Sequence, residues 1–120
     1  TILIQARPYG PVCHTGSISC FNDVAPYNTQ FLGQLGLLIA DRHAAMPAGS
    51  YTTGLFADGK ARIAQKVGEE GVEVALARMK DDKTEIVNET ADLLFHMMVL
   101  LQDAGLTLGD VIKVLEERCR

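Results

Sequence analysis

Apolar residues recur at helical spacing through most of this chain. Within residues 28–45, one face of a helix would carry Phe31, Leu32, Leu35, Leu38 and Ile39. The same spacing predicts a second helix from about 60 to 80 and a third from 82 to 104, where Asp82 and Glu85 resemble a capping box. A fourth helix is expected from 107 onward, opened by a Thr-x-x-Asp pair.

The segments around these helices have other patterns. Thr1–Arg7 is a short β-like run, residues 8–26 are rich in Gly, Pro, Ser and Cys, and residues 46–59 have the composition of a connection. We therefore expect a mainly α chain, with a β-containing segment at 1–26 and a four-helix domain at 27–120. Because the chain begins at Thr1 within a strand-like run, we also expect a longer N-terminal portion to precede it.

Composition narrows the functional classes. The chain has 120 residues and a net charge of −4 without a basic run, which argues against nucleic-acid binding. It has neither an apolar run of the roughly 20 residues that span a membrane nor a signal-peptide pattern, so we expect a cytoplasmic protein. Its three cysteines argue against a disulfide framework.

Two acidic pairs carry the candidate chemistry: Glu70-x-x-Glu73 and Glu89-x-x-Asp92. Each pair has the spacing that places two side chains on one side of a helix, and apolar neighbours put both pairs beside the buried face. Two antiparallel helices of this kind can hold Mg²⁺, which binds carboxylates and substrate phosphates. The alternative is a solvated charged face, in which Lys66 and Glu70 form an ordinary surface pair.

The second half of the third helix, residues 93–101, is apolar nearly all round. Such a segment is expected to be buried on several sides. A small four-helix monomer cannot cover it, so the pattern predicts a helical homodimer.

Three longer motifs make a family resemblance specific. Ser50-Tyr51-Thr52, the stretch from Arg62 to Glu73 and the stretch from Asn88 to His96 resemble phosphoribosyl-ATP pyrophosphohydrolase, an enzyme of histidine biosynthesis. The resemblance implies an all-α nucleotide pyrophosphohydrolase fold, a dimer whose core combines helices of both chains, and Mg²⁺-dependent hydrolysis of phosphoribosyl-ATP to phosphoribosyl-AMP and pyrophosphate.

The resemblance also suggests roles for individual residues. Glu70, Glu73, Glu89 and Asp92 would bind Mg²⁺. Glu69 would bind a second metal or act with Glu70 in catalysis as a general base. Arg62 and Lys66, the cationic side chains nearby, would contact phosphate oxygens. His96 is either a packing residue or a catalytic one.

A second candidate metal site lies near the N-terminus. Cys13 and Cys20, with His14 adjacent, are either two zinc ligands or two unrelated buried thiols. The segment resembles the end of phosphoribosyl-AMP cyclohydrolase, whose zinc site uses three cysteines and which is often fused ahead of the pyrophosphohydrolase. The first cysteine would lie upstream of Thr1. The resemblance therefore implies only a partial Zn²⁺ site, and cyclohydrolase activity only in a full-length protein.

Two other functions stay open. The chain could clear other nucleoside triphosphates, or it could be a non-catalytic module that dimerises a cyclohydrolase. His43 and Cys119 have no assigned role.

Overall fold

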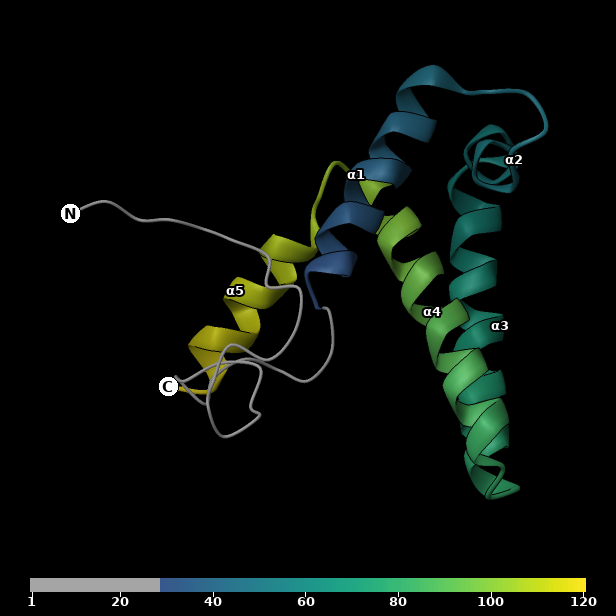
Figure 1. Cartoon of the computed structure of the whole chain (residues 1–120), viewed down its shortest axis with the longest axis vertical. Helices are drawn as coiled ribbons and strands as arrows, with labels where there is room; N and C mark the ends of the chain where they lie inside the picture. Colours follow the sequence, from purple (N-terminus) through teal and green to yellow (C-terminus); the bar gives the residue numbers. More distant parts are fainter. Residues whose placement is uncertain (1–28) are drawn as a thin grey trace, which may run out of the picture. The chain divides into compact units, whose positions relative to one another are not determined.

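The computed structural model describes residues 29–120, and this part of the chain forms five helices with no strand (Figure 1). Residues 32–120 make one compact unit. The prediction of a mainly α chain is confirmed, whereas the β-containing segment expected at 1–26 lies outside the described residues. The helices are α1 (Gln30–Ala45), α2 (Tyr51–Asp58), α3 (Lys60–Met79), α4 (Lys83–Asp103) and α5 (Leu108–Arg118).

Helix α2 corrects the prediction of four helices, because it lies within residues 46–59, which were expected to be a connection. Its eight residues are too few to be stable alone. The Ser50 side chain caps it by accepting a hydrogen bond from the Thr53 N–H, and the Leu55 and Phe56 side chains are buried. Gly59, at φ 85°, then turns the chain into α3. Tertiary burial, rather than helix periodicity, therefore stabilises α2.

Helices α3 and α4 form an antiparallel hairpin through a short turn (Figure 1). The Asp82 carboxylate accepts hydrogen bonds from the Thr84 and Glu85 N–H groups, both at 3.0 Å, and so begins α4. The expected capping box is only half formed, because Glu85 instead pairs with Lys80 at 2.7 Å. This hairpin fixes which side chains of α3 face α4.

The predicted boundary between α4 and α5 is confirmed. Gly105 follows α4 with φ 72°, a left-handed conformation that glycine adopts readily at the end of a helix. Thr107 and Asp110, the pair predicted to open this helix, form a capping box, and the Thr107 N–H donates to the Asp110 carboxylate at 2.8 Å.

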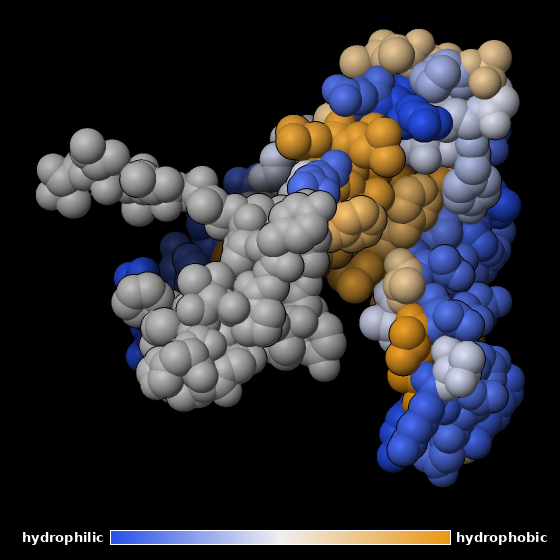
Figure 2. Space-filling model, in the orientation of Figure 1, coloured by the Kyte–Doolittle hydropathy of each residue, from blue (hydrophilic) through white to orange (hydrophobic). Residues whose placement is uncertain are grey.

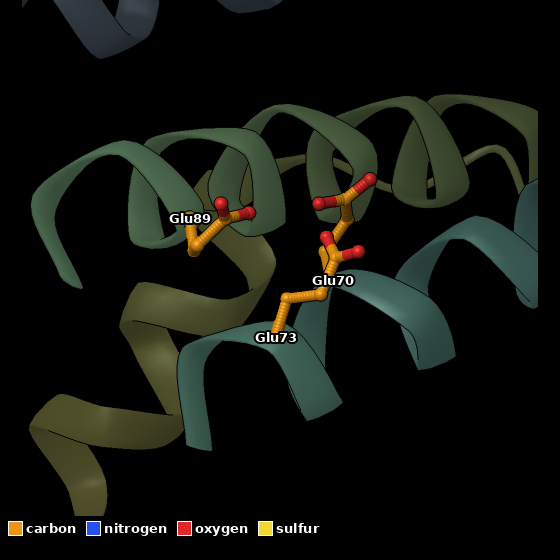
Figure 3. Close-up of side chains that lie close together, drawn as sticks. All are labelled: Glu70, Glu73 and Glu89. Atoms are coloured by element: carbon orange, nitrogen blue, oxygen red, sulfur yellow. The ribbon is translucent and has the colours of Figure 1, made fainter. Parts of the chain in front are cut away.

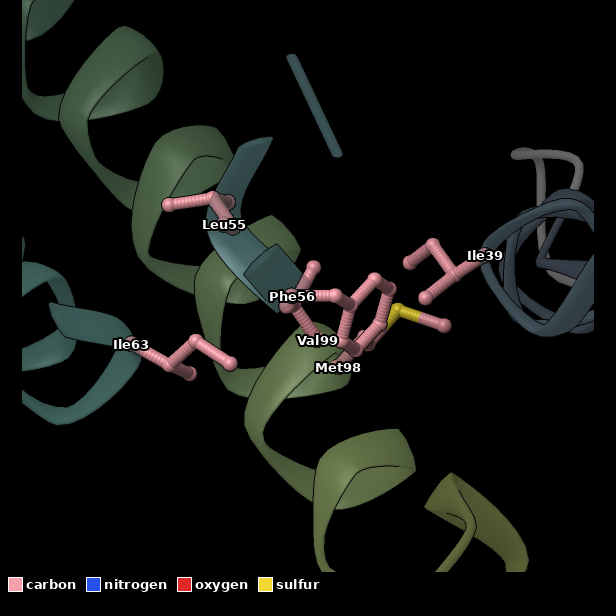
Figure 4. Close-up of a cluster of buried hydrophobic side chains, with 6 residues drawn as sticks. All are labelled: Ile39, Leu55, Phe56, Ile63, Met98 and Val99. Atoms are coloured by element: carbon pink, nitrogen blue, oxygen red, sulfur yellow. The ribbon is translucent and has the colours of Figure 1, made fainter. Parts of the chain in front are cut away.

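The buried core joins the first four helices (Figure 4). Ile63 of α3 and Val99 of α4 are 1% and 0% exposed. Within residues 93–101 the expectation of burial on several sides holds only in part, because Leu94 and Met97 remain 36% and 38% exposed in the single chain. The full set of core side chains is Ile39, Leu55, Phe56, Ile63, Met98 and Val99.

Candidate metal centre

Three of the four predicted acids come together between α3 and α4. Glu70 and Glu73 lie one turn apart on α3, and Glu89 comes from α4. Each offers a carboxylate oxygen within 4.8 Å of the others. Figure 3 shows the three side chains pointing toward one another from the two helices. The i,i+3 spacing and the antiparallel hairpin together produce this convergence.

Asp92 is the predicted acid that stays outside this group. It lies on α4 one turn beyond Glu89, and its side chain is exposed. Its backbone carbonyl accepts a hydrogen bond from His96 Nδ1 at 2.8 Å. The structure therefore assembles a cluster of three acids, and the fourth acid, Asp92, lies three residues after Glu89 on α4.

Lys66 supplies the cation nearest to this cluster. Its Nζ lies 2.7 Å from Glu70 Oε1 and 3.0 Å from Glu69 Oε2. The Lys66 and Glu70 side chains are only 18% and 6% exposed, so this is a largely buried ion pair. Hydrogen bonding to Lys66 lowers the pKa of Glu70 and of Glu69, and the same bonds raise the pKa of Lys66. All three groups are therefore ionised at neutral pH.

Glu73 has the opposite perturbation. Its hydrogen bond to Glu70 and the negative charges of Glu70 and Glu89 raise its pKa. Three carboxylates at this separation repel one another, and Lys66 contacts only one of them in an ion pair. A donor set made of carboxylate oxygens suits a hard divalent cation such as Mg²⁺. The residues present therefore fit the metal that the sequence predicts.

The remaining predicted catalytic and substrate-binding residues lie on the α3 turns before Glu70. Glu69 is 40% exposed at its side chain and accepts a hydrogen bond from Gln65 at 2.8 Å. Arg62, 43% exposed, lies 3.9 Å from the same carboxylate. Together with Lys66, these side chains place two cations and one carboxylate beside the cluster, within reach of solvent.

His96 and Tyr51 form a second layer beside Glu70. His96 is buried, and its Nδ1 donates to the Asp92 carbonyl, so its Nε2 accepts the hydrogen bond from the Tyr51 hydroxyl at 2.9 Å. The same Nδ1 lies 3.7 Å from Glu70 Oε1. Tyr51 had no role in the sequence prediction because its helix was not expected. The one sequence feature that pointed to Tyr51 was its place in the Ser50-Tyr51-Thr52 motif.

His43 and Cys119, which had no assigned role, are not members of the acidic cluster. Cys13, His14 and Cys20 are outside the described residues. His43 stacks on Phe56 with ring centroids 4.0 Å apart, which gives it a packing role. Cys119 is an exposed free thiol.

A hollow of about 260 Å³ between α1, α4 and α5 is lined mainly by apolar side chains and contains none of the acidic cluster. Among the described helices, none is both long enough and apolar enough to cross a bilayer.

Comparisons with known proteins identify the family of this chain. The family model for phosphoribosyl-ATP pyrophosphohydrolase matches residues 32–119. The histidine biosynthesis bifunctional protein HisIE of Xanthomonas campestris pv. campestris is 57% identical over 118 residues, and those of Vibrio cholerae serotype O1 and Escherichia coli K12 are 52% and 53% identical over 120 and 118 residues. Each alignment covers 98% of this chain but only 56%, 57% and 58% of the respective relative.

Proposed function

The chain belongs to the phosphoribosyl-ATP pyrophosphohydrolase family of hydrolases, and we propose that it catalyses the Mg²⁺-dependent hydrolysis of phosphoribosyl-ATP to phosphoribosyl-AMP and pyrophosphate. The observation that carries this proposal is the convergence of Glu70, Glu73 and Glu89 between α3 and α4. A cluster that acidic would repel a triphosphate unless a cation lay between them.

Glu70, Glu73 and Glu89 would hold the cation, with Asp92 as a further ligand from α4. When bound, Mg²⁺ supplies charge neutralisation at the phosphates and lowers the pKa of a coordinated water. Three oxygen ligands from two helices are consistent with the few protein carboxylates that such a metal uses in phosphate-binding enzymes.

The chain's own residues account for the rest of the reaction. Lys66 and Arg62 would bind phosphate oxygens and orient the triphosphate. Water then cleaves the anhydride bond between the α- and β-phosphates, and the β- and γ-phosphates leave as pyrophosphate. Glu69 is ionised and half-exposed, so it can accept the proton that the attacking water loses.

A substrate comparison tests this proposal. The purified chain is assayed for pyrophosphate release from phosphoribosyl-ATP, ATP and dCTP, with Mg²⁺ and again with EDTA. We expect release from phosphoribosyl-ATP that EDTA abolishes, and much slower release from the simple triphosphates. Equal rates on all three would indicate a general triphosphate pyrophosphohydrolase. No release from any of them would indicate a non-catalytic module.

We also propose that the active form is a homodimer. Large apolar side chains remain exposed on both hairpin helices, including Val72 and Leu76 of α3 and Leu94 and Met97 of α4. On the face drawn in Figure 2, apolar residues gather in one area, while hydrophilic residues cover one end of the hairpin. Burial of such side chains against a second copy would remove apolar surface from water.

A further inference from the structure

We propose that Lys66 is a built-in counter-ion of the metal site: its ammonium group neutralises Glu70 while no divalent cation is bound, and cation binding displaces it from that carboxylate. The inference rests on the proposed function for the existence of the cation site. It adds a role for Lys66 that is separate from contact with phosphate, namely control of how tightly the cation binds.

The first argument is the burial of Glu70. Its side chain is 6% exposed and lies among two other carboxylates, an environment in which an unpaired negative charge is strongly disfavoured. The 2.7 Å contact with Lys66 is its closest ion pair. His96, its other nearby nitrogen, is 3.7 Å away and donates its Nδ1 proton to a backbone carbonyl. Lys66 therefore supplies the charge compensation that the buried Glu70 carboxylate needs when no metal is bound.

The second argument is that Lys66 and a cation need the same group. Glu70 is the only fully buried member of the acidic cluster, and Lys66 bonds directly to one of its two oxygens. A divalent ion bound by Glu70, Glu73 and Glu89 would lie close to the ammonium group and be repelled by it. Simultaneous binding at full strength is therefore disfavoured, so the two cations compete.

The third argument is that Lys66 has a second partner to which it can move. Glu69 Oε2 lies 3.0 Å from the same ammonium, and the Glu69 side chain is 40% exposed. Lys66 can give up Glu70 and keep Glu69 through rotation of its own flexible side chain, without any movement of α3. Displacement thus leaves no unpaired buried charge, and it moves the ammonium toward solvent, where phosphate oxygens would arrive.

Binding of Mn²⁺ to the substrate-free chain tests the competition. Free Mn²⁺ is counted by its electron paramagnetic resonance signal during a titration, so no turnover is needed. We expect Lys66→Met to bind Mn²⁺ about tenfold more tightly than the unmutated chain. Lys66→Gln, which keeps a hydrogen-bond donor for both carboxylates, should show the same direction and protects the test against a folding defect in the first variant.

Two sets of controls accompany this titration. Lys80→Met removes an equal charge at the end of the same helix, where Lys80 pairs with Glu85, and should change the affinity less than twofold. Glu69→Gln should weaken Mn²⁺ binding several-fold, because Lys66 then has only Glu70 left. In the double variant with Lys66→Met that weakening should disappear, whereas it would persist if Glu69 itself bound the ion.

Thermal unfolding gives a second readout. In EDTA, Lys66→Met should unfold at a lower temperature than the unmutated chain, because Glu70 loses its partner. Saturating Mn²⁺ should raise its unfolding temperature by more than it raises that of the unmutated chain.

Unchanged or weaker Mn²⁺ binding by both Lys66 variants would overturn the inference and leave the metal site intact. Absence of Mn²⁺ binding in the unmutated chain would instead remove the metal site, and with it the proposed function.

Discussion

Replacement of Glu70 by glutamine tests the candidate site most directly. The change keeps the size and helical preference of the side chain but removes the charge of the buried member of the cluster. Loss of one preorganised group that stabilises transition-state charge, such as an oxyanion-hole donor, typically costs on the order of 10²–10³ in rate. We therefore expect Mg²⁺-dependent pyrophosphate release from phosphoribosyl-ATP to fall by about that factor.

The stability effect of the same substitution should be small, for reasons visible in the structure. A hydrogen bond to a charged group contributes about 1.5–3 kcal/mol to stability. The amide oxygen of the Glu70→Gln variant would still accept a hydrogen bond from the charged Lys66 ammonium, so only a part of that contribution, about 1 kcal/mol, is lost. Lys66 keeps its ion pair with Glu69 at 3.0 Å, and the repulsion felt by Glu73 is relieved. We expect a change of about 1 kcal/mol or less in the free energy of unfolding in EDTA.

The assay combines steady-state kinetics at several Mg²⁺ concentrations with urea unfolding monitored by circular dichroism. Glu117→Gln, an exposed change of the same kind on α5, is the matched control and should leave both quantities unaltered. Full activity of Glu70→Gln with an unchanged Mg²⁺ requirement would refute the metal-site assignment. It would mean that the acidic cluster is a structural feature of the hairpin.

Three further predictions concern pH, the core and the dimer. Because the pKa of Glu73 is raised in the folded chain, ionised Glu73 destabilises the metal-free protein, and this penalty grows as pH rises through and above the ordinary Glu range. In EDTA, the unfolding temperature of Glu73→Gln minus that of the unmutated chain should therefore increase between about pH 4 and 7. A difference that stays constant over this range would contradict the raised pKa of Glu73. Ile63→Ala empties a position that is 1% exposed and should cost about 2–5 kcal/mol of unfolding free energy in urea, whereas Val114→Ala on exposed α5 should cost about 0.5 kcal/mol or less. Met97→Glu places a charge on the exposed apolar side of α4 and should shift the chain from dimer to monomer in sedimentation analysis while circular dichroism stays helical; a monomeric unmutated chain would exclude the dimer.

Met97 is a better position than Leu100 for a substitution that tests the dimer. Leu100 lies in the same apolar run as Met97, but it is partly buried and packs against the core of its own chain. A charge at Leu100 would therefore disturb folding and association together. Met97 separates the two effects because it is exposed in the single chain.

Local patterns determined most of the helical domain. Apolar periodicity located α1, α3 and α4, and the Asp82 and Thr107 caps marked the starts of α4 and α5, because these signals act within a few residues of the chain. The same periodicity placed Glu70 with Glu73, and Glu89 with Asp92, on the sides of helices that carry buried residues. The family resemblance then supplied the expected reaction.

Only the tertiary structure decided which of these groups meet. Helix α2 exists because Leu55 and Phe56 are buried against other helices, and its eight residues have no strong periodicity of their own. The packing of α3 on α4 brings Glu89 to Glu70 and Glu73 while Asp92 stays outside, a choice set by helix register that i,i+3 spacing cannot specify. The contact of Tyr51 with His96 joins residues 45 positions apart. Such contacts depend on how whole elements pack, so sequence periodicity does not contain them.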